Sequence, residues 1–115
     1  MIDLTKWEQI ASEQIHNRKQ IAGRLGGRIA VVTGSAQGFG KGIAEELYRE
    51  GAFVVIADLN EPLAQTVAAS LGERAIAIKT DVSSEESVAN LITATVEAFG
   101  GLDLFVSNAG VLKAG

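Results

Sequence analysis

The sequence predicts an α/β fold in which helices cover both faces of a doubly wound parallel sheet. Two observations support this class. From residue 28 onward, short apolar runs alternate with amphipathic helical patterns, which is typical of right-handed βαβ units. The apolar runs are continuous, as expected for strands that are buried on both faces. With 115 residues, 47% of them hydrophobic, the chain has room for one domain with a core and not for two full-sized domains.

Residues 1–27 differ from the rest and predict a leader helix followed by a hinge. Thr5 and Glu8 form a capping box, in which each side chain pairs with a free backbone N–H at the helix start. The apolar residues that follow fall on one face at helical spacing. Three glycines within residues 23–27 interrupt that pattern. We therefore divide the chain into a leader, residues 1–27, and a sheet domain, residues 28–115.

Each predicted element of the sheet domain follows from an apolar run and from the residues at its ends. Asn60 caps the second helix, with Pro62 in its first turn and Gly72 directly after it. Ser83 and Glu86 form a capping box at the start of the third helix. Strands are predicted at 29–33, 53–57, 75–79 and 102–107, and helices at 40–50, 60–71 and 83–99. A doubly wound sheet places these strands in the order 3-2-1-4 and leaves the fourth at an edge.

The composition excludes several classes of function. Ten basic and fourteen acidic residues give a net charge of −4 and a pI of about 4.9, which disfavours a basic nucleic-acid surface. Without cysteine there are no disulfides or cysteine-bound zinc, and one histidine excludes a multi-histidine centre, so we predict no metal site. No stretch has the roughly 20 apolar residues of a transmembrane helix, and the charged first residues do not form a signal peptide. We expect a cytoplasmic protein that binds neither nucleic acid nor membrane.

The turn after the first strand, Thr33–Gly40, predicts a phosphate-binding loop of the Rossmann type. Gly34 permits a sharp reversal, because glycine lacks a Cβ atom. Gly38 lets the backbone approach a pyrophosphate, and Gly40 lets the following helix pack closely. The helix N-terminus offers unpaired N–H groups and a positive dipole end to the phosphates. The alternative is a glycine-rich turn without a ligand.

The carboxylate of Asp58 follows the second strand, eighteen residues after Gly40. In this position it can accept hydrogen bonds from both hydroxyls of an adenosine ribose, and it would repel the 2′-phosphate of NADP. Gln37 and Leu59 add no basic partner for that phosphate near the turn. The sequence therefore predicts NAD as the cofactor in preference to NADP. The alternative is a solvated aspartate that serves as a turn residue before the next helix.

Four motifs in the same order resemble the short-chain dehydrogenase/reductase family. They are T-G-S-A-Q-G-F-G at Thr33–Gly40, A-D-L at Ala57–Leu59, D-V at Asp81–Val82 and S-N-A-G at Ser107–Gly110. The preceding G-L-D at Gly101–Asp103 is also similar to the family pattern. The spacing of the first motif differs from that of the G-x-G-x-x-G dehydrogenases. The resemblance covers the sheet domain and not the leader.

The resemblance implies a role for each matching residue. Backbone groups of Ser35, Phe39 and the turn glycines would hold the pyrophosphate and the nearby ribose. Asp58 would hold the adenosine ribose, Asp81 would contact the adenine amino group and Val82 would lie beside the ring. The nicotinamide-side ribose would be lined by the last three residues of the fourth motif. The complete set of predicted cofactor-binding residues is Gly34, Ser35, Gln37, Gly38, Phe39, Gly40, Asp58, Leu59, Asp81, Val82, Asn108, Ala109 and Gly110.

Three positions qualify these assignments. Asp81 has an alternative role as a cap or turn residue before Ser83. Phe39 stands where the family usually has isoleucine, a change that a backbone role tolerates. Ser107 replaces the first asparagine of the family's N-N-A-G, so we expect looser hydrogen bonding there.

The family's chemistry uses residues that the resemblance places after the fourth strand: a serine, and a tyrosine and lysine four apart. The chain ends at Gly115, and its one tyrosine, Tyr48, has Ala52 four residues later. We therefore predict no catalytic residue in this chain. We expect it to be the cofactor-binding half, or a fragment, of a longer NAD-dependent dehydrogenase that binds NAD without turning over. The parent would transfer a hydride between nicotinamide and an alcohol or carbonyl substrate and would form a homo-oligomer.

Other interpretations remain open at the level of sequence. A non-catalytic dinucleotide-sensing or assembly module would keep the turn and Asp58 and would not need the tyrosine. The leader helix is also compatible with the dehydrogenase domain of a fusion enzyme, such as an aldolase joined to a dehydrogenase. A nucleotide-sugar or methyl-donor Rossmann domain is a weaker reading, and the turn spacing with Asp81 and Asn108 argues against methyl donors.

Overall fold

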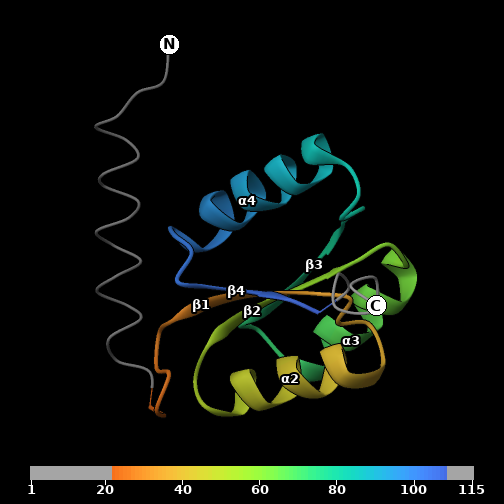
Figure 1. Cartoon of the computed structure of the whole chain (residues 1–115). Helices are drawn as coiled ribbons and strands as arrows, with labels where there is room; N and C mark the ends of the chain where they lie inside the picture. The colour runs from red at the N-terminus through yellow and green to blue at the C-terminus, as the bar shows by residue number, and fades with distance from the viewer. Residues whose placement is uncertain (1–21, 109–115) are drawn as a thin grey trace, which may run out of the picture.

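The computed structural model describes residues 22–108, in which a parallel sheet lies between two layers of helices (Figure 1). The four strands are hydrogen-bonded in the order β3-β2-β1-β4, which confirms the predicted α/β class and strand order. Of the predicted leader, residues 1–21 fall outside the described residues, as do Ala109 and Gly110, and residues 24–27 form turns. The elements are β1 (Ile29–Thr33), α2 (Gly38–Arg49), β2 (Phe53–Asp58), α3 (Glu61–Leu71), β3 (Ala75–Lys79), α4 (Glu85–Phe99) and β4 (Leu104–Ser107).

Two apolar clusters form the core, one on each face of the sheet. Alternate residues of β1 and β2, such as Val32 and Ile56, pack under α2 and α3. Their neighbours Val31 and Val55 point to the other face and pack under α4. This alternation has the two-residue period of a strand, and it explains why a strand covered on both faces is apolar throughout. In Figure 1, α4 lies above the sheet and α2 and α3 lie below it.

The strand register aligns the carboxyl ends of the strands at one edge of the sheet. Thr33, the last residue of β1, lies opposite Ala57 of β2 and Ser107 of β4. Asp58, the last residue of β2, lies opposite Lys79 at the end of β3. The segments that follow all four strands therefore meet at this edge. The predicted glycine-rich turn, the Asp58 carboxylate and the third and fourth motifs come from these segments.

Three predicted boundaries are wrong by two residues, one of them the start of α4, which lies at Glu85 and not at Ser83. Helix α2 begins at Gly38 and not at Gly40, because the carbonyl of Gln37 already accepts from the N–H of Lys41. Strand β4 begins at Leu104 and not at residue 102. Just before the strand, the N–H of Asp103 donates to the Ile29 carbonyl and its carboxylate accepts the N–H of Ile29, both at 2.9 Å.

The caps of the two later helices differ in how well the sequence predicts them. Asn60 caps α3 as predicted, since its side chain accepts from the N–H of Leu63 at 3.2 Å. The cap of α4 is Ser84, whose hydroxyl oxygen accepts from the N–H of Ser87, and not the predicted Ser83. The hydroxyl and the N–H of Ser83 are both bonded to Asp81, so Ser83 belongs to the preceding turn.

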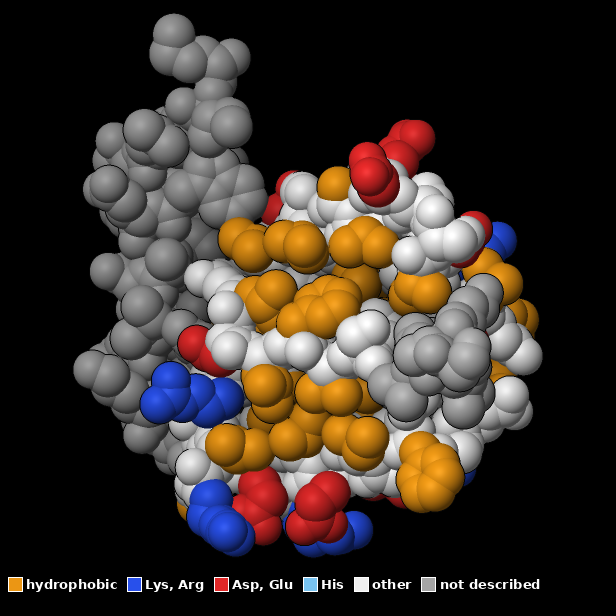
Figure 2. Space-filling view, viewed as in Figure 1, with side chains coloured by type: hydrophobic (Ala, Val, Ile, Leu, Met, Phe, Trp, Pro, Cys, Tyr) orange, Lys and Arg blue, Asp and Glu red, His pale blue; other side chains and the backbone are white. Residues whose placement is uncertain are grey.

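Strand β4 differs from the other strands in its exposure. Every residue of β1 is buried, whereas Leu104 and Phe105 of β4 are 41% and 39% exposed. Hydrophobic side chains gather on the face of the molecule that carries α4, β4 and α2 (Figure 2). Strand β4 is also an edge of the sheet, so one side of its backbone lacks a neighbouring strand among the described residues. Within residues 22–108, no helix is long and apolar enough to span a bilayer.

Candidate functional site

The turn between β1 and α2 depends on two glycines in the left-handed region. Gly34 has φ +65° and Gly38 has φ +63°, values that residues with a Cβ atom rarely adopt. The N–H of Gly34 donates to the carbonyl of Ala57 at 2.7 Å, which ties the start of the turn to the end of β2. The turn is thus held in place by β2 as well as by its own strand.

Gly40 lets α2 approach this turn closely. A Cβ atom at Gly40 would lie 2.2 Å from the carbonyl oxygen of Gly34 and 2.8 Å from Nδ2 of Asn108. The same Asn108 amide donates to the Gly34 carbonyl at 3.3 Å. The helix, the turn and the end of β4 therefore meet at one point, and a side chain at position 40 would separate them. This is the packing role that the sequence predicts for Gly40.

The N-terminus of α2 faces the site without an acidic side chain of its own. The first N–H groups of a helix, here those of Gly38, Phe39 and Gly40, have no partner within the helix. The first turns of α3 and α4 carry Glu61 and Glu85 respectively, whereas the first turn of α2 carries no acidic residue. The positive dipole end of α2 is therefore the one at this edge that is not already balanced by a carboxylate in its first turn.

The predicted turn residues Ser35 and Gln37 lie in different environments. Ser35 is completely buried, and its hydroxyl donates to the carbonyl of Val32 at 2.7 Å. The structure therefore does not bring Ser35 to the surface of the site, and its contacts stabilise the turn from within. Gln37 is exposed and directly precedes α2, where its side chain makes no capping hydrogen bond.

The carboxylate of Asp58 connects two backbone segments of the site. One oxygen, Oδ2, accepts the N–H of Ala36 in the glycine-rich turn at 3.0 Å. The other, Oδ1, accepts the N–H of Asn60 at the start of α3, also at 3.0 Å. An ionised carboxylate has about four acceptor positions, so each oxygen keeps capacity for one further donor. The predicted turn role of Asp58 and its capacity to bind a ligand are therefore compatible.

A cavity of about 210 Å³ lies beside Asp58 at the carboxyl edge of the sheet. The side chains of Leu59 and Val82 are 62% and 39% exposed and give it apolar walls. Asp81 lines the cavity and also accepts from the N–H and the hydroxyl of Ser83, at 2.9 and 2.6 Å. The turn role considered for Asp81 is thus present, and its carboxylate also lies at the wall of the cavity. The lining residues are Gly34, Asp58, Leu59, Thr80, Asp81, Val82 and Ser83.

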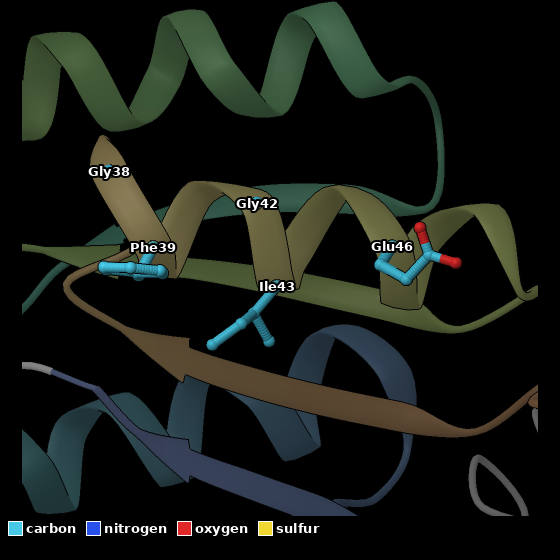
Figure 3. A pocket seen from close by; sticks show the side chains of 5 residues that line it. All are labelled: Gly38, Phe39, Gly42, Ile43 and Glu46. Atoms are coloured by element: carbon cyan, nitrogen blue, oxygen red, sulfur yellow. The ribbon is translucent and has the colours of Figure 1, made fainter.

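The side chain of Phe39 points away from this cavity. It is 88% exposed and lines a second, open hollow of about 590 Å³ along α2. Figure 3 shows Phe39 and Ile43 on the same side of the helix, with Gly38 at its start and Gly42 and Glu46 further along. Only the backbone of Phe39 lies at the turn, as the predicted backbone role requires.

Sequence reasoning missed three residues of this site. Thr80 and Ser83 line the cavity, and Ala36 supplies the N–H that Asp58 accepts. Thr80 and Ser83 flank the D-V motif directly, so their place in the sequence is a signal that identifies them. Ala36 has no such signal, because its contribution comes from a backbone N–H that every residue except proline carries. Among residues 22–108, no group of three or more acidic or histidine side chains is suited to hold a metal ion.

A parallel sheet with a glycine-rich turn before its first helix and a carboxylate after its second strand defines the dinucleotide-binding class of α/β proteins. Within this class the family is established by comparison with known proteins. A family model described as short chain dehydrogenase matches residues 28–115. The chain belongs to the short-chain dehydrogenase/reductase family.

Individual relatives agree with this assignment. The chain is 44% identical to tropinone reductase-like 1 of Erythroxylum coca over 90 residues, which are 78% of this chain and 33% of that protein. It also resembles the crystal structure of 3-ketoacyl-(acyl-carrier-protein) reductase from Brucella melitensis complexed with NADH. That match has a TM-score of 0.69 and 37% identity, over 70% of this chain and 33% of the reductase.

A hydroxysteroid dehydrogenase from Escherichia coli is similar in structure, with a TM-score of 0.70 and 34% identity. The match covers 73% of this chain and 37% of the dehydrogenase. The chain thus spans about a third of the length of the curated relatives that it matches.

Proposed function

We propose that this chain is the cofactor-binding part of a nicotinamide-dependent oxidoreductase. The observation that supports it best is the link through Asp58, which joins the glycine-rich turn to a cavity large enough for part of a nucleotide. Family membership and the NADH complex of a similar reductase support the same cofactor class. The parent enzyme would transfer a hydride between nicotinamide and the carbinol or carbonyl carbon of its substrate.

In this proposal each part of the carboxyl edge binds one part of the dinucleotide. The N-terminus of α2 faces the pyrophosphate, and the Asp58 carboxylate accepts from the adenosine ribose hydroxyls. The apolar walls formed by Leu59 and Val82 suit a flat adenine ring, and Asp81 accepts from its amino group. Asn108, with the residues that follow it, lies toward the nicotinamide end. When bound, the cofactor supplies the hydride chemistry, and this chain supplies binding and orientation.

We further propose that NAD is preferred over NADP. The cavity beside Asp58 is lined by two aspartates, and its described lining includes neither lysine nor arginine. A 2′-phosphate on the adenosine ribose would bring further negative charge next to the Asp58 carboxylate, where like charges repel. The hydroxyl of NAD instead donates a hydrogen bond to the same carboxylate.

Asp58→Ala tests this preference directly. We expect the variant to lose affinity for NAD and to gain relative affinity for NADP, so that the ratio of the two dissociation constants shifts by about tenfold. Titration calorimetry on the full chain measures both constants. Asp81→Ala is the matched control, because the adenine is common to both cofactors and both affinities should fall together. An unchanged ratio in Asp58→Ala would mean that Asp58 does not select between the cofactors.

The same proposal holds that this chain binds NAD without turnover. Its one tyrosine, Tyr48, packs under the guanidinium of Arg74, whose central carbon lies 3.9 Å from the ring centre. Tyr48 is on α2 near the amino end of the sheet, away from the candidate site. Steady NADH formation by this chain from NAD and a panel of alcohols would contradict this part of the proposal.

A further inference from the structure

The Asp58 carboxylate accepts hydrogen bonds from two backbone segments of the site. It bonds the N–H of Ala36 in the turn and the N–H of Asn60 at the start of α3, both at 3.0 Å. Ala36 is 2% exposed and Asp58 is partly buried, so the bond between them is shielded from water. Hydrogen bonds to a charged acceptor are stronger than those between neutral groups, and partial burial strengthens them further.

Other contacts hold the turn on either side of the Asp58 bond, including that of the Asn108 amide to the Gly34 carbonyl. The start of the turn is held by the bond between Gly34 and Ala57, and Ser35 is anchored to Val32. The methyl group of the next residue, Ala36, is buried in the core cluster under α2 and α3, and its N–H is bonded by Asp58. Gly38, two residues later, adopts the positive φ from which α2 starts. The Asp58 carboxylate thus holds the point at which the chain turns from the buried strand toward the helix N-terminus.

We propose that Asp58 is a positioning residue for the phosphate-binding turn, in addition to its proposed contact with the ribose. Through Ala36 it sets where the N-terminus of α2 stands relative to the nucleoside cavity. Recognition of the ribose and recognition of the pyrophosphate are therefore coupled through one carboxylate. This inference rests on the proposed function, since it concerns how the same site holds its cofactor.

The coupling has a consequence for a 2′-phosphorylated cofactor. A 2′-phosphate repels the carboxylate and favours its displacement from the cavity. Displacement would break the bond to Ala36. The loss of binding free energy would then include the altered position of the turn as well as the repulsion at the ribose. A residue that only contacts the ribose would not transmit the effect in this way.

A cofactor without ribose hydroxyls separates the two roles. The probe is NAD whose adenosine ribose lacks both the 2′- and the 3′-hydroxyl, so that it offers Asp58 no hydrogen bond. If Asp58 positions the turn, Asp58→Ala and Asp58→Asn should bind this analogue about tenfold more weakly than the unchanged chain does. If Asp58 acts through the ribose alone, its replacement should leave the dissociation constant of the analogue unchanged, and that result would overturn the proposal.

Amide hydrogen exchange of the ligand-free chain provides a second readout. In both Asp58 variants, protection of the Ala36 N–H should fall by about tenfold. Asp103→Ala is the matched control, because Asp103 also accepts a backbone N–H next to β1, that of Ile29 at 2.9 Å, at the opposite end of the strand. This control should lower the protection of the Ile29 N–H and leave both the Ala36 exchange and the affinity for the analogue unchanged.

The outcomes separate this inference from the proposed function. If the unchanged chain fails to bind NAD, the proposed function is wrong, and the exchange of Ala36 alone decides whether Asp58 holds the turn. If NAD binds and Ala36 loses protection while the analogue binds all variants equally, the bond exists without positioning the phosphate site, and the inference is wrong. Asp58→Asn keeps the size of the side chain, so a folded variant remains if Asp58→Ala does not fold.

Discussion

The two ends of the sheet are built from the same strands, yet they differ in what surrounds their polar groups. At the amino end, the Arg74 guanidinium bonds the carbonyls of Tyr48 and Ala52 and stacks on the Tyr48 ring. Asp103 bonds the N–H of Ile29 and lies 4.0 Å from the Arg28 guanidinium. At the carboxyl end, a cavity lies beside Asp58, and the first turn of α2 carries no acidic residue. Polar side chains are paired at both ends, and the carboxyl end also carries the cavity beside Asp58.

The direction of the helices explains this difference. In a parallel sheet each connecting helix starts near the carboxyl end of one strand and finishes near the amino end of the next. Helix C-termini, with their unpaired carbonyls, therefore collect at the amino end, where Arg74 satisfies those near the end of α2. Helix N-termini collect at the carboxyl end, where unpaired N–H groups favour an anion. The fold itself thus separates a stabilising end from the end that carries the candidate site, called the binding end below.

The strongest test of this comparison replaces Gly40 at the binding end. Gly40→Ala forces a methyl group against the Gly34 carbonyl, so we expect about 3 kcal/mol of destabilisation and loss of NAD binding. Gly42→Ala is the control, since the same methyl group on the same helix meets nothing within 4 Å. That variant should be more stable by up to about 1 kcal/mol, because alanine is the better helix former. Urea unfolding and calorimetry measure both effects, and equal stabilities would refute the packing role.

At the amino end of the sheet we expect the opposite pattern, a loss of stability without a loss of NAD affinity. Arg74→Met removes the hydrogen bonds to Tyr48 and Ala52 and the contact with the Tyr48 ring, so stability should fall by about 2 kcal/mol. The affinity for NAD should stay within about twofold, because the change lies at the far end of the sheet. Arg49→Met serves as the control, since Arg49 pairs with Glu46 on the surface and its loss should change stability by less than about 0.5 kcal/mol. A large loss of NAD affinity in Arg74→Met would show that the two ends are not independent.

The smallest effect distinguishes the two serines before α4. Ser84→Ala removes the helix cap and should lower stability by about 1 kcal/mol. Ser83→Ala removes one exposed hydrogen bond to Asp81 and should lower it by less than about 0.5 kcal/mol. Thermal unfolding compares the two variants. A larger loss of stability in Ser83→Ala would mean that Ser83 caps α4, as the sequence predicts.

The order and type of the elements could be predicted from the sequence because they depend on local patterns. The apolar runs at Ile29–Thr33 and Ala75–Lys79 are strands with the predicted boundaries, and Asn60 caps α3 as predicted. The start of β4 could not be predicted in this way. It lies next to contacts between Asp103 and Ile29, residues 74 positions apart, which no local pattern indicates.

The site shows the same division between local and distant information. The glycines of the turn and the aspartates at the strand ends are visible as motifs, and the structure brings Gly34, Asp58, Asp81 and Asn108 to one edge of the sheet. The burial of Ser35 and the bond between Asp58 and the Ala36 N–H leave no trace in the sequence. Both arise from how β1 and β2 lie side by side, which only the folded chain determines.

The position of β4 beside β1 has a consequence for the order of folding. Strands β1, β2 and β3 pair with their neighbours in sequence, whereas the bonds from Asp103 to Ile29 and from Asn108 to Gly34 each span 74 residues. Closing so long a loop is slower than forming local pairs, because the chain loses more entropy before contacts compensate for it. We therefore expect β4 to dock last. Since Asn108 touches the glycine-rich turn, the binding end would be completed only at that final step.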